Sequence, residues 1–311
     1  MSEPPPHQPV LYNEIIHALQ PRRAGRYVDC TVGAGGHARG ILEASQPDGV
    51  LLGLDVDPVA LELAQKRLEP FSGRVFLVRA SFTTLRAQLD RMGWETVNGI
   101  LIDLGVSSMQ LDTPDRGFSF QLEAELDMRF DPGAPVRAMD LVNNMQEIEL
   151  AELIYKYGEE RRSRQIARAI VRERPIKTTL DLARVVADAC GGRRGRRHPA
   201  TRTFQALRIV VNQELAALEE VLPQAVESLE AGGRLAVIAY HSLEDRIAKQ
   251  YFRQESLDCI CPPQQPVCTC GHKAAIKELT RRPLRPTESE IRSNPRSRSA
   301  RLRVVEKLRT Q

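Results

Sequence analysis

The sequence predicts a doubly wound α/β fold, in which helices cover both faces of a parallel sheet, with an all-helical domain inserted into it. Three observations support this prediction. Apolar, β-rich runs alternate with helical patterns in the first third of the 311-residue chain, as they do in parallel sheets. The first run leads directly into a glycine-rich turn after Val32. The alternation then stops, and helical patterns without a clear strand follow to about Ala200.

Four runs are expected to form strands of this parallel sheet. They are Tyr27 to Val32, Val50 to Asp55, Arg74 to Val78 and Gly99 to Leu104. A helix is expected after the second run, because Pro58 stands at its first turn, where a missing amide donor breaks no helical bond. Such a helix supplies the crossover that two parallel strands need.

The middle of the chain is predicted to be helical from about Thr113 to Ala200, with the clearest segments at Ile148 to Tyr157 and Arg162 to Val171. This helical segment lies between the four strands expected in the first third of the chain and the strands expected in the last third. The pattern therefore predicts two domains: a discontinuous sheet domain, residues 1–112 and 203–311, and a helical domain, residues 113–202.

The last third of the chain is expected to complete the sheet. A long helical pattern from Thr203 to Leu229 leads through two glycines into an apolar run, Arg234 to Tyr240. A last strand is expected at Leu302 to Val305. The intervening residues 259–300, which are rich in Cys, Pro and Arg, are predicted to be irregular.

Composition argues against a membrane protein. Apolar residues make up 42% and charged residues 27% of the chain, as in ordinary globular proteins. No apolar run approaches the roughly 18 residues of a spanning helix. The first six residues have neither a basic start nor an apolar core, so they do not form a secretory signal. We expect a cytoplasmic protein; the sequence carries no signal for its oligomeric state.

Positive charge is concentrated in two segments. Residues 161–202 hold thirteen Arg and Lys against three Asp and Glu, and residues 281–311 hold ten against three, although the net charge is only +4. Two basic blocks on an otherwise acidic chain favour binding to a polyanion, most plausibly nucleic acid. The simpler interpretation is that each arginine lies on an ordinary solvated face.

The glycine-rich turn indicates a nucleotide site. Gly33-x-Gly35-Gly36-x-Ala38 fits the loose pattern found in NAD, FAD and S-adenosyl-methionine sites. Asp55 follows Gly33 by twenty-two residues, after the second expected strand, where a carboxylate commonly accepts ribose hydroxyls. A glycine-rich turn without any ligand is the alternative.

Two further carboxylates favour S-adenosyl-methionine over a dinucleotide. Asp29 lies in the first expected strand, just ahead of the glycine-rich turn, and Asp103 lies at the end of the fourth. Both should therefore meet Asp55 at the carboxyl edge of one sheet, where such sheets bind ligands. Crowded carboxylates repel phosphates, whereas S-adenosyl-methionine offers a ribose diol, an amino group and a sulfonium.

Several longer motifs, spread over almost the whole chain, resemble one family. They are Asp29-Cys30-Thr31-Val32-Gly33-Ala34-Gly35-Gly36-His37, Asp55-Val56-Asp57-Pro58, Leu101 to Asp112, Arg116-Gly117-Phe118-Ser119-Phe120, Leu126-Asp127-Met128-Arg129, Tyr157 to Arg161, Thr201 to Ala206 and His241 to Arg246. Together they resemble the bacterial MraW family of cytidine-N4 methyltransferases that act on small-subunit rRNA.

The resemblance implies a class I (Rossmann-like) S-adenosyl-methionine-dependent methyltransferase fold with an inserted all-helical domain. It implies N4-methylation of a decoding-centre (P-site) cytidine in the 16S rRNA of the small ribosomal subunit. It also implies a set of cofactor contacts: the turn residues Gly35, Gly36 and His37, Asp55 at the ribose, Phe82 beside the adenine, and Asp103 with Gln110 near the methionine end.

Methyl transfer to an amine also needs a proton acceptor, because the nitrogen loses a proton during or after attack. The candidates are Asp103, by its position, and His241, which follows the fifth expected strand. The alternative for His241 is a structural histidine beside a helix cap formed by Ser242 and Asp245.

Two other features carry hypotheses about binding. Asp127 and Arg129 either contact the target nucleotide or form a plain salt bridge. The Arg-rich residues 193–197 and the tail from Arg292 to Arg303 are expected to contact rRNA phosphates around the unstacked target base. For residues 193–197 the alternative is a solvated loop.

Four of the six cysteines fall within twelve positions. Cys259, Cys261, Cys268 and Cys270 form two C-x-C pairs, and a cytoplasmic location makes disulfides improbable. They are candidates for a structural, all-cysteine zinc site, with unliganded cysteines as the alternative.

Two other functions compete with the methyltransferase hypothesis. A nicotinamide-dependent oxidoreductase would also explain the glycine-rich turn and Asp55. A non-catalytic rRNA-binding assembly factor would explain the basic segments, and it would bind ribosomal particles without transferring a methyl group.

Overall fold

The structure is a computed structural model that describes residues 9–192, 198–262, 264–265 and 267–309. The chain divides into two compact units. The sheet unit comprises Met1–Gly105 and Ala217–Gln311, and the helical unit comprises Val106–Ala216. The helical unit is therefore longer at both ends than the segment 113–202 that the sequence suggested.

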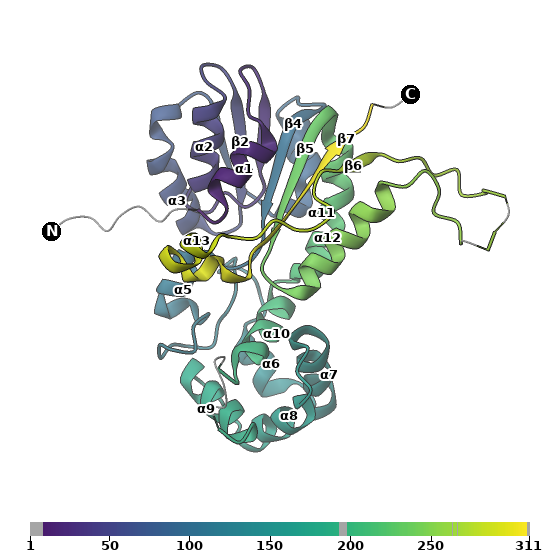
Figure 1. The fold of residues 1–311 in the computed structure, drawn as a ribbon. Helices are drawn as coiled ribbons and strands as arrows, with labels where there is room; N and C mark the ends of the chain where they lie inside the picture. The colour runs from purple at the N-terminus through teal and green to yellow at the C-terminus, as the bar shows by residue number, and fades with distance from the viewer. Residues whose placement is uncertain (1–8, 193–197, 263, 266, 310–311) are drawn as a thin grey trace. The chain divides into compact units, whose positions relative to one another are not determined.

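The sheet unit is built on a seven-stranded sheet with the order β3-β2-β1-β4-β5-β7-β6 (Figure 1). Its strands are β1 (Arg26–Asp29), β2 (Val50–Asp55), β3 (Val75–Arg79), β4 (Val97–Asp103), β5 (Leu229–Ala239), β6 (Ile276–Glu278) and β7 (Arg301–Lys307). The first five strands are parallel, whereas β7 runs antiparallel to both β5 and β6. The parallel arrangement expected for the strands of the first third of the chain is confirmed, and the last two strands add an antiparallel edge.

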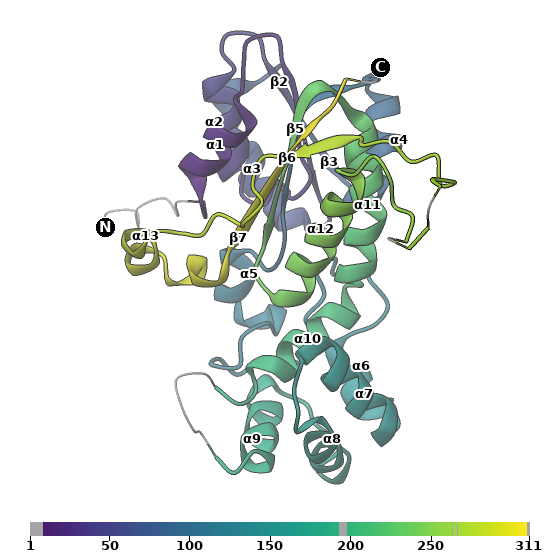
Figure 2. The same ribbon diagram turned by 45° about the vertical axis from the view of Figure 1, so that its right-hand side comes forward.

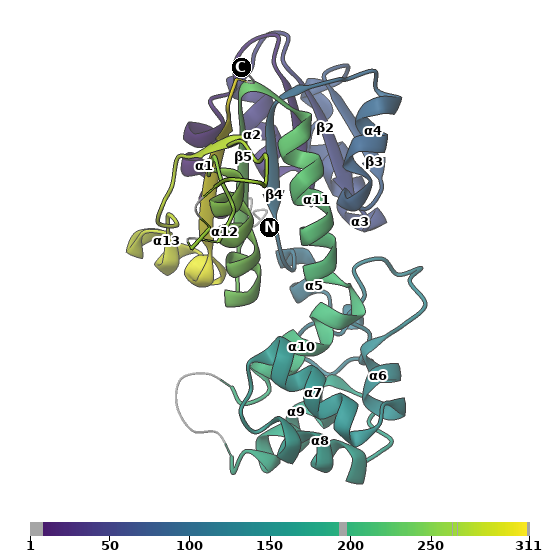
Figure 3. The same ribbon diagram turned by 90° about the vertical axis from the view of Figure 1, so that its right-hand side faces the viewer.

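Helices cover both faces of the sheet, and side chains along each strand alternate between them. On β1, Tyr27 packs with α1 (Tyr12–Leu19), α2 (Gly36–Ala44) and α3 (Pro58–Arg67), whereas Val28 packs with the opposite layer. That layer contains α4 (Leu85–Arg91), α11 (Glu214–Ser228) and α12 (Ser242–Glu255); Figure 3 is viewed from the side of α11 and α12. The short helices η1 (Glu69–Phe71), η2 (Phe82–Thr84), α13 (Glu288–Ser293) and η4 (Pro295–Ser299) connect these elements.

The helical unit has a hydrophobic core of its own. Its helices are α5 (Ser108–Asp112), η3 (Pro114–Arg116), α6 (Ala138–Asn144), α7 (Glu147–Gly158), α8 (Ser163–Arg172), α9 (Thr179–Ala189) and α10 (Thr201–Val211). Figure 2 shows α8 and α9 side by side. Its described residues form no strand, apart from an isolated bridge between Glu125 and Thr178. In the described part of the whole chain, no helix combines the length and apolar character needed to span a membrane.

The long helix expected from Thr203 to Leu229 is two helices, α10 and α11. The chain breaks at Gln213, whose φ is 51°, a left-handed conformation that ends a helix. The preceding Asn212 holds this break: its Nδ2 donates to the carbonyl of Met128 at 2.8 Å, and its Oδ1 accepts from the amide of Phe130 at 2.7 Å. Because α10 packs in the helical core, the boundary between the units lies after it.

Residues 259–300 are less irregular than predicted, because they contain β6, α13 and η4. β6 has only three residues and pairs with β7 from Ile276 opposite Lys307. A strand of this length is too short to show a recognisable periodicity in the sequence. It forms because it pairs with β7. β5, which lies on the other side of β7, is also longer than predicted. It begins at Leu229, whereas the predicted run begins at Arg234.

Candidate functional site

Three carboxylates meet at the carboxyl edge of the sheet. Asp29, Asp55 and Asp103 lie at the last positions of β1, β2 and β4, which are adjacent strands. Thr31 links two of these strands, because its Oγ1 accepts a hydrogen bond of 2.7 Å from the amide of Asp103. The structure thus brings together side chains that lie up to seventy-four positions apart in the sequence.

The glycine-rich turn lies beside Asp55. The amide of Gly33 donates to Asp55 Oδ2 at 2.9 Å. Gly35 has a φ of 77° and forms the N-cap of α2, which has no side-chain cap. Position 36 also requires glycine, because a Cβ there would lie 2.4 Å from Pro9. The first turn of α2 therefore presents backbone amides without a capping side chain, as anion- and polar-group-binding helix starts do.

Asp55 is held in one orientation by the backbone. Its Oδ1 accepts from the amide of Asp57 at 2.9 Å, opposite the bond from Gly33. Burial raises its pKa despite these bonds. Phe82 stands in η2, shortly after β3 pairs with β2 beside Asp55, and its ring is partly buried against the core. This places Phe82 at the same edge of the sheet.

Asp29 is buried with one oxygen unsatisfied. The residue is 1% exposed, its Oδ1 accepts from the amide of Thr31 at 3.2 Å, and its Oδ2 has no hydrogen-bond partner. Burial, helped by the charges of Asp103 and Asp55, raises its pKa to about 7, although His37 opposes this shift. A buried carboxylate oxygen without a partner is costly, so a cationic or hydrogen-bonding ligand here would satisfy it.

Asp103 lies between a tyrosine and a histidine. Its Oδ1 accepts a hydrogen bond of 3.0 Å from the hydroxyl of Tyr240, and its Oδ2 lies 3.6 Å from His37 Nδ1. Because His37 Nε2 donates to the carbonyl of Val10 at 2.9 Å, Nδ1 is the nitrogen that faces the carboxyl. Burial raises the pKa of Asp103 to about 7 and lowers the pKa of His37.

His241 caps a helix. It is the N-cap of α12, its Nδ1 accepts from the amide of Glu244 at 3.4 Å, and its Nε2 lies 3.1 Å from Glu244 Oε1. In return, Glu244 Oε2 accepts from the amides of Tyr240 and His241. The capping box is therefore His241 with Glu244. The predicted box of Ser242 with Asp245 was wrong by one residue, because Ser242 is already helical.

Asp245 stabilises the end of the chain. Its carboxylate pairs with Arg303 at 2.7 Å and with Arg301 at 3.0 Å. These bonds outweigh burial and lower the pKa of Asp245. Arg303 is only 4% exposed. The expected phosphate-binding tail thus uses two of its arginines internally, whereas Arg292 has an exposed side chain.

Gln110, Asp127 and Arg129 belong to the helical unit. The Gln110 side chain closes the capping box of α5, where its Oε1 accepts from the amide of Ser107 at 3.1 Å. Asp127 and Arg129 form a salt bridge of 2.6 Å, which matches the plainer of the two interpretations. Residues 193–197 lie outside the described residues.

The surface of the helical unit carries a row of arginines. Arg164, Arg168 and Arg172 are exposed and lie four residues apart on α8, so they share one face. Their opposite face buries Ile166 and Ile170. We call these three residues the α8 arginine row. Arg168 pairs with Glu147 at 3.5 Å, and Arg172 pairs with Glu173 at 3.3 Å. The row is a solvent-facing surface within the basic segment, and two of its three arginines have an acidic neighbour.

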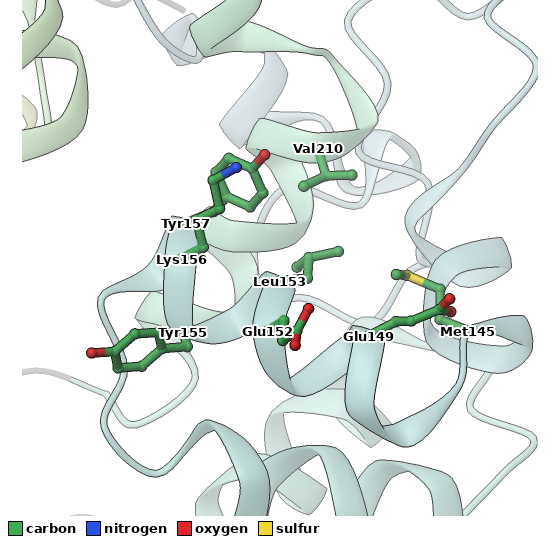
Figure 4. A pocket seen from close by; sticks show the side chains of 8 residues that line it. All are labelled: Met145, Glu149, Glu152, Leu153, Tyr155, Lys156, Tyr157 and Val210. Atoms are coloured by element: carbon green, nitrogen blue, oxygen red, sulfur yellow. The ribbon is translucent and has the colours of Figure 1, made fainter.

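A hollow of about 590 Å³ lies on the same unit (Figure 4). Tyr155 and Tyr157 lie at one end of it and Met145 at the other. Its other lining residues are Glu149, Glu152, Leu153, Lys156 and Val210. Tyr155 is 63% exposed, and Lys156 Nζ lies 4.9 Å from the centre of the Tyr157 ring. The hollow therefore combines exposed aromatic surface with charges of both signs.

The sequence reasoning missed Tyr240, although a signal for it existed. Tyr240 directly follows β5, which is the neighbour of β4 and pairs Ile238 with Asp103. A polar residue at that point must lie at the same edge of the sheet as Asp103. The hydrogen bond between Tyr240 and Asp103 makes it part of the candidate site.

The family model and the curated relatives that match this chain agree on one family. A family model described as the MraW methylase family matches residues 5–308. Ribosomal RNA small subunit methyltransferase H of Dehalococcoides mccartyi is 55% identical over 303 residues, which cover 97% of this chain and 87% of the relative. The protein of the same name from Thermomicrobium roseum is 54% identical over 305 residues, covering 97% and 94%. Among solved structures, an rRNA methylase from Streptococcus thermophilus has a TM-score of 0.42 and 13% identity, covering 96% of this chain and 94% of that one.

Proposed function

The chain belongs to the MraW methylase family and is an RNA methyltransferase, and from this premise we propose its substrate, cofactor and site. The substrate is the N4 amine of a decoding-centre (P-site) cytidine in 16S rRNA, within the small ribosomal subunit in the cytoplasm. The methyl donor is S-adenosyl-methionine. The observation that carries the proposal is the cluster of three carboxylates, with an unpartnered oxygen on Asp29, at the carboxyl edge of the sheet.

The donor set fits S-adenosyl-methionine. The Asp55 carboxylate, oriented by two amides, suits a ribose diol. The buried carboxyls of Asp29 and Asp103 suit the amino and sulfonium groups, because a positive charge repays their desolvation. The Gly35–Gly36 turn lets the backbone approach the cofactor, His37 lies in the first turn of α2 beside it, and Phe82 is assigned to the adenine. Gln110 is assigned to the methionine end by the family resemblance.

In the proposed reaction, a bond forms between the cytosine N4 and the methyl carbon as the bond from that carbon to sulfur breaks. S-adenosyl-methionine supplies the methyl group as an electrophile. The protein's main task is to hold N4 in line at near-attack distance. N4 must then lose a proton. We assign its acceptance to the Asp103 carboxylate, which lies at the carboxyl edge of the sheet within the proposed site.

His241 is the second candidate for the proton acceptor, and its surroundings support it less. Its Nδ1 already accepts the helix amide of Glu244, and its Nε2 lies against the Glu244 carboxylate. A histidine used in this way is a helix cap whose ring is fixed by its own helix. We therefore give His241 a structural role at the edge of the site.

We assign rRNA recognition to the helical unit as an RNA-binding domain. The α8 arginine row supplies positive charge for phosphates, and exposed Tyr155 supplies an aromatic surface for an unstacked base. Exposed Arg292 of the sheet unit is a further phosphate contact in this proposal. In this proposal a metal has only a structural role, bound by the four clustered cysteines, and it takes no part in methyl transfer.

The decisive experiment uses labelled S-adenosyl-methionine and small ribosomal subunits that lack the modification, followed by digestion and mass spectrometry of the nucleosides. N4-methylcytidine at one position supports the proposal. Asp103→Asn is the matched variant, because it keeps the shape of the side chain and removes its basicity. Binding of subunits and cofactor without methyl transfer would instead indicate a non-catalytic assembly factor, and binding of NADH in place of S-adenosyl-methionine would indicate an oxidoreductase.

A further inference from the structure

The loop between α12 and β6 brings four cysteines together at its surface. The Sγ atoms of Cys259, Cys261, Cys268 and Cys270 all lie within 4.8 Å of one another. Three of these residues are exposed and Cys261 is half-buried, so packing in an apolar core does not hold them. Thiols form only weak hydrogen bonds, and such bonds offset little of the entropy lost when a loop is ordered. A stronger interaction is needed to account for the cluster.

The separations between the sulfurs match a tetrahedral metal site. Cys268 Sγ lies 3.6 Å from Cys270 Sγ, which lies 3.9 Å from Cys259 Sγ. Four sulfurs at the zinc–sulfur distance of about 2.3 Å are separated by about 3.8 Å along each edge of the tetrahedron. A disulfide would instead require about 2.05 Å. We propose that these four cysteines bind one Zn²⁺ ion as a tetrathiolate site.

A backbone amide also points at one of the sulfurs. The amide of His272 donates to Cys270 Sγ at 3.5 Å. A hydrogen bond of this kind favours the thiolate, which is the form of cysteine that binds a metal.

The position of the cluster gives the metal a structural role. α12 begins at the carboxyl edge of the sheet, and its fourteen residues carry the chain about 21 Å away from that edge. The loop is fastened at its base, where the amide of Ala275 donates to the carbonyl of Glu255 at 2.8 Å and His272 Nε2 donates to the carbonyl of Gln254 at 3.1 Å. Zinc would fix the part of the loop beyond this base.

The test measures metal and thiols on the full-length protein. The chain is purified without chelator or metal-affinity resin, and its metals are quantified by mass spectrometry. We expect one zinc per chain, released together with the modification of four thiols by a mercurial reagent. Replacement by Co²⁺ should give the visible bands of tetrahedral cobalt and sulfur-to-cobalt charge-transfer bands. This spectrum needs no variant and reports on the ligand set directly.

Variants locate the metal. The double variant Cys259→Ser/Cys270→Ser should lose the zinc, whereas Cys190→Ala, at a cysteine of the helical unit, should keep one zinc per chain. Binding of S-adenosyl-methionine shows whether the double variant is folded. If the double variant is not folded, the zinc stoichiometry and the cobalt spectrum of the wild-type protein still test the proposal. Four freely reactive thiols without metal, disulfides found by mass spectrometry, or iron in place of zinc would each overturn the proposal.

Discussion

Asp29 and Asp103 are carboxyls that burial keeps partly protonated near neutral pH, since each has a pKa of about 7. Their neighbours explain why the site tolerates them. Tyr240 donates to Asp103, and His37 faces it with a neutral ring because burial lowers the histidine pKa. In the protein alone, protons reduce the repulsion between these carboxyls. A cationic ligand also reduces this repulsion, so the ligand and protons compete for the two carboxyls.

This competition predicts that the affinity for S-adenosyl-methionine rises with pH. Below about pH 6 both carboxyls are largely protonated, and above about pH 8 both are ionised and attract the amino and sulfonium groups. We expect calorimetric titrations to show a lower Kd at the higher pH. Asp29→Asn should weaken binding at high pH and flatten this dependence. An affinity of the wild-type protein that is equal at both pH values would contradict the assignment.

The elements position these residues by the way they begin and end. Parallel strands deliver carboxylates from distant parts of the chain to one edge, while α2 begins there without a side-chain cap. α12 begins at the same edge but is fully capped by His241 and Glu244. The first backbone amides of α2 are therefore available to a ligand, whereas those of α12 are occupied by its cap.

The cap interpretation of His241 predicts different results for two substitutions. Asparagine is a strong N-cap, so His241→Asn should retain most of the stability and kcat, whereas His241→Ala should lose about 1 kcal/mol of stability. Thermal unfolding and single-turnover methylation measure both effects. A loss of 10²-fold or more in kcat for the asparagine variant, with cofactor affinity unchanged, would instead make His241 the proton acceptor.

The α8 arginine row predicts an effect on RNA binding alone. Reversal of Arg164, Arg168 and Arg172 to Glu should weaken binding to the small subunit and reduce the slope of log K against log salt by up to about three. Affinity for S-adenosyl-methionine should not change. The matched control reverses the exposed residues Arg23, Lys66 and Arg91 of the sheet unit, with the same change in charge. Equal losses in the two variants would indicate a non-specific effect of charge.

At the scale of the whole molecule, two units with separate cores divide the work proposed for this methyltransferase. The sheet unit contains the carboxylates and the glycine-rich turn. The helical unit contains the α8 arginine row and the hollow lined by tyrosines. Separate cores allow a ligand of one unit to stabilise it without stabilising the other.

Hydrogen exchange should reveal this division. Saturating S-adenosyl-methionine, at 100 times its Kd, stabilises the state that binds it by about 2.7 kcal/mol. We expect slower exchange at the β1–α2 turn and at the ends of β2 and β4, with little change in α7, α8 and α9. Protection that spreads through these three helices would show that the units respond to the cofactor as one body.

The sequence by itself determined the α/β fold class, the positions of most strands along the chain and the family, because periodicity and contiguous motifs are local signals. It also pointed to Asp29, Asp55 and Asp103, since strand ends can be read from apolar runs. The tertiary structure alone decided the antiparallel β7 and β6, the break at Gln213 that moves α10 into the helical unit, and the use of His241 as a cap. Each of these depends on a pairing or packing partner distant in the chain, or on a one-residue register that no periodicity encodes.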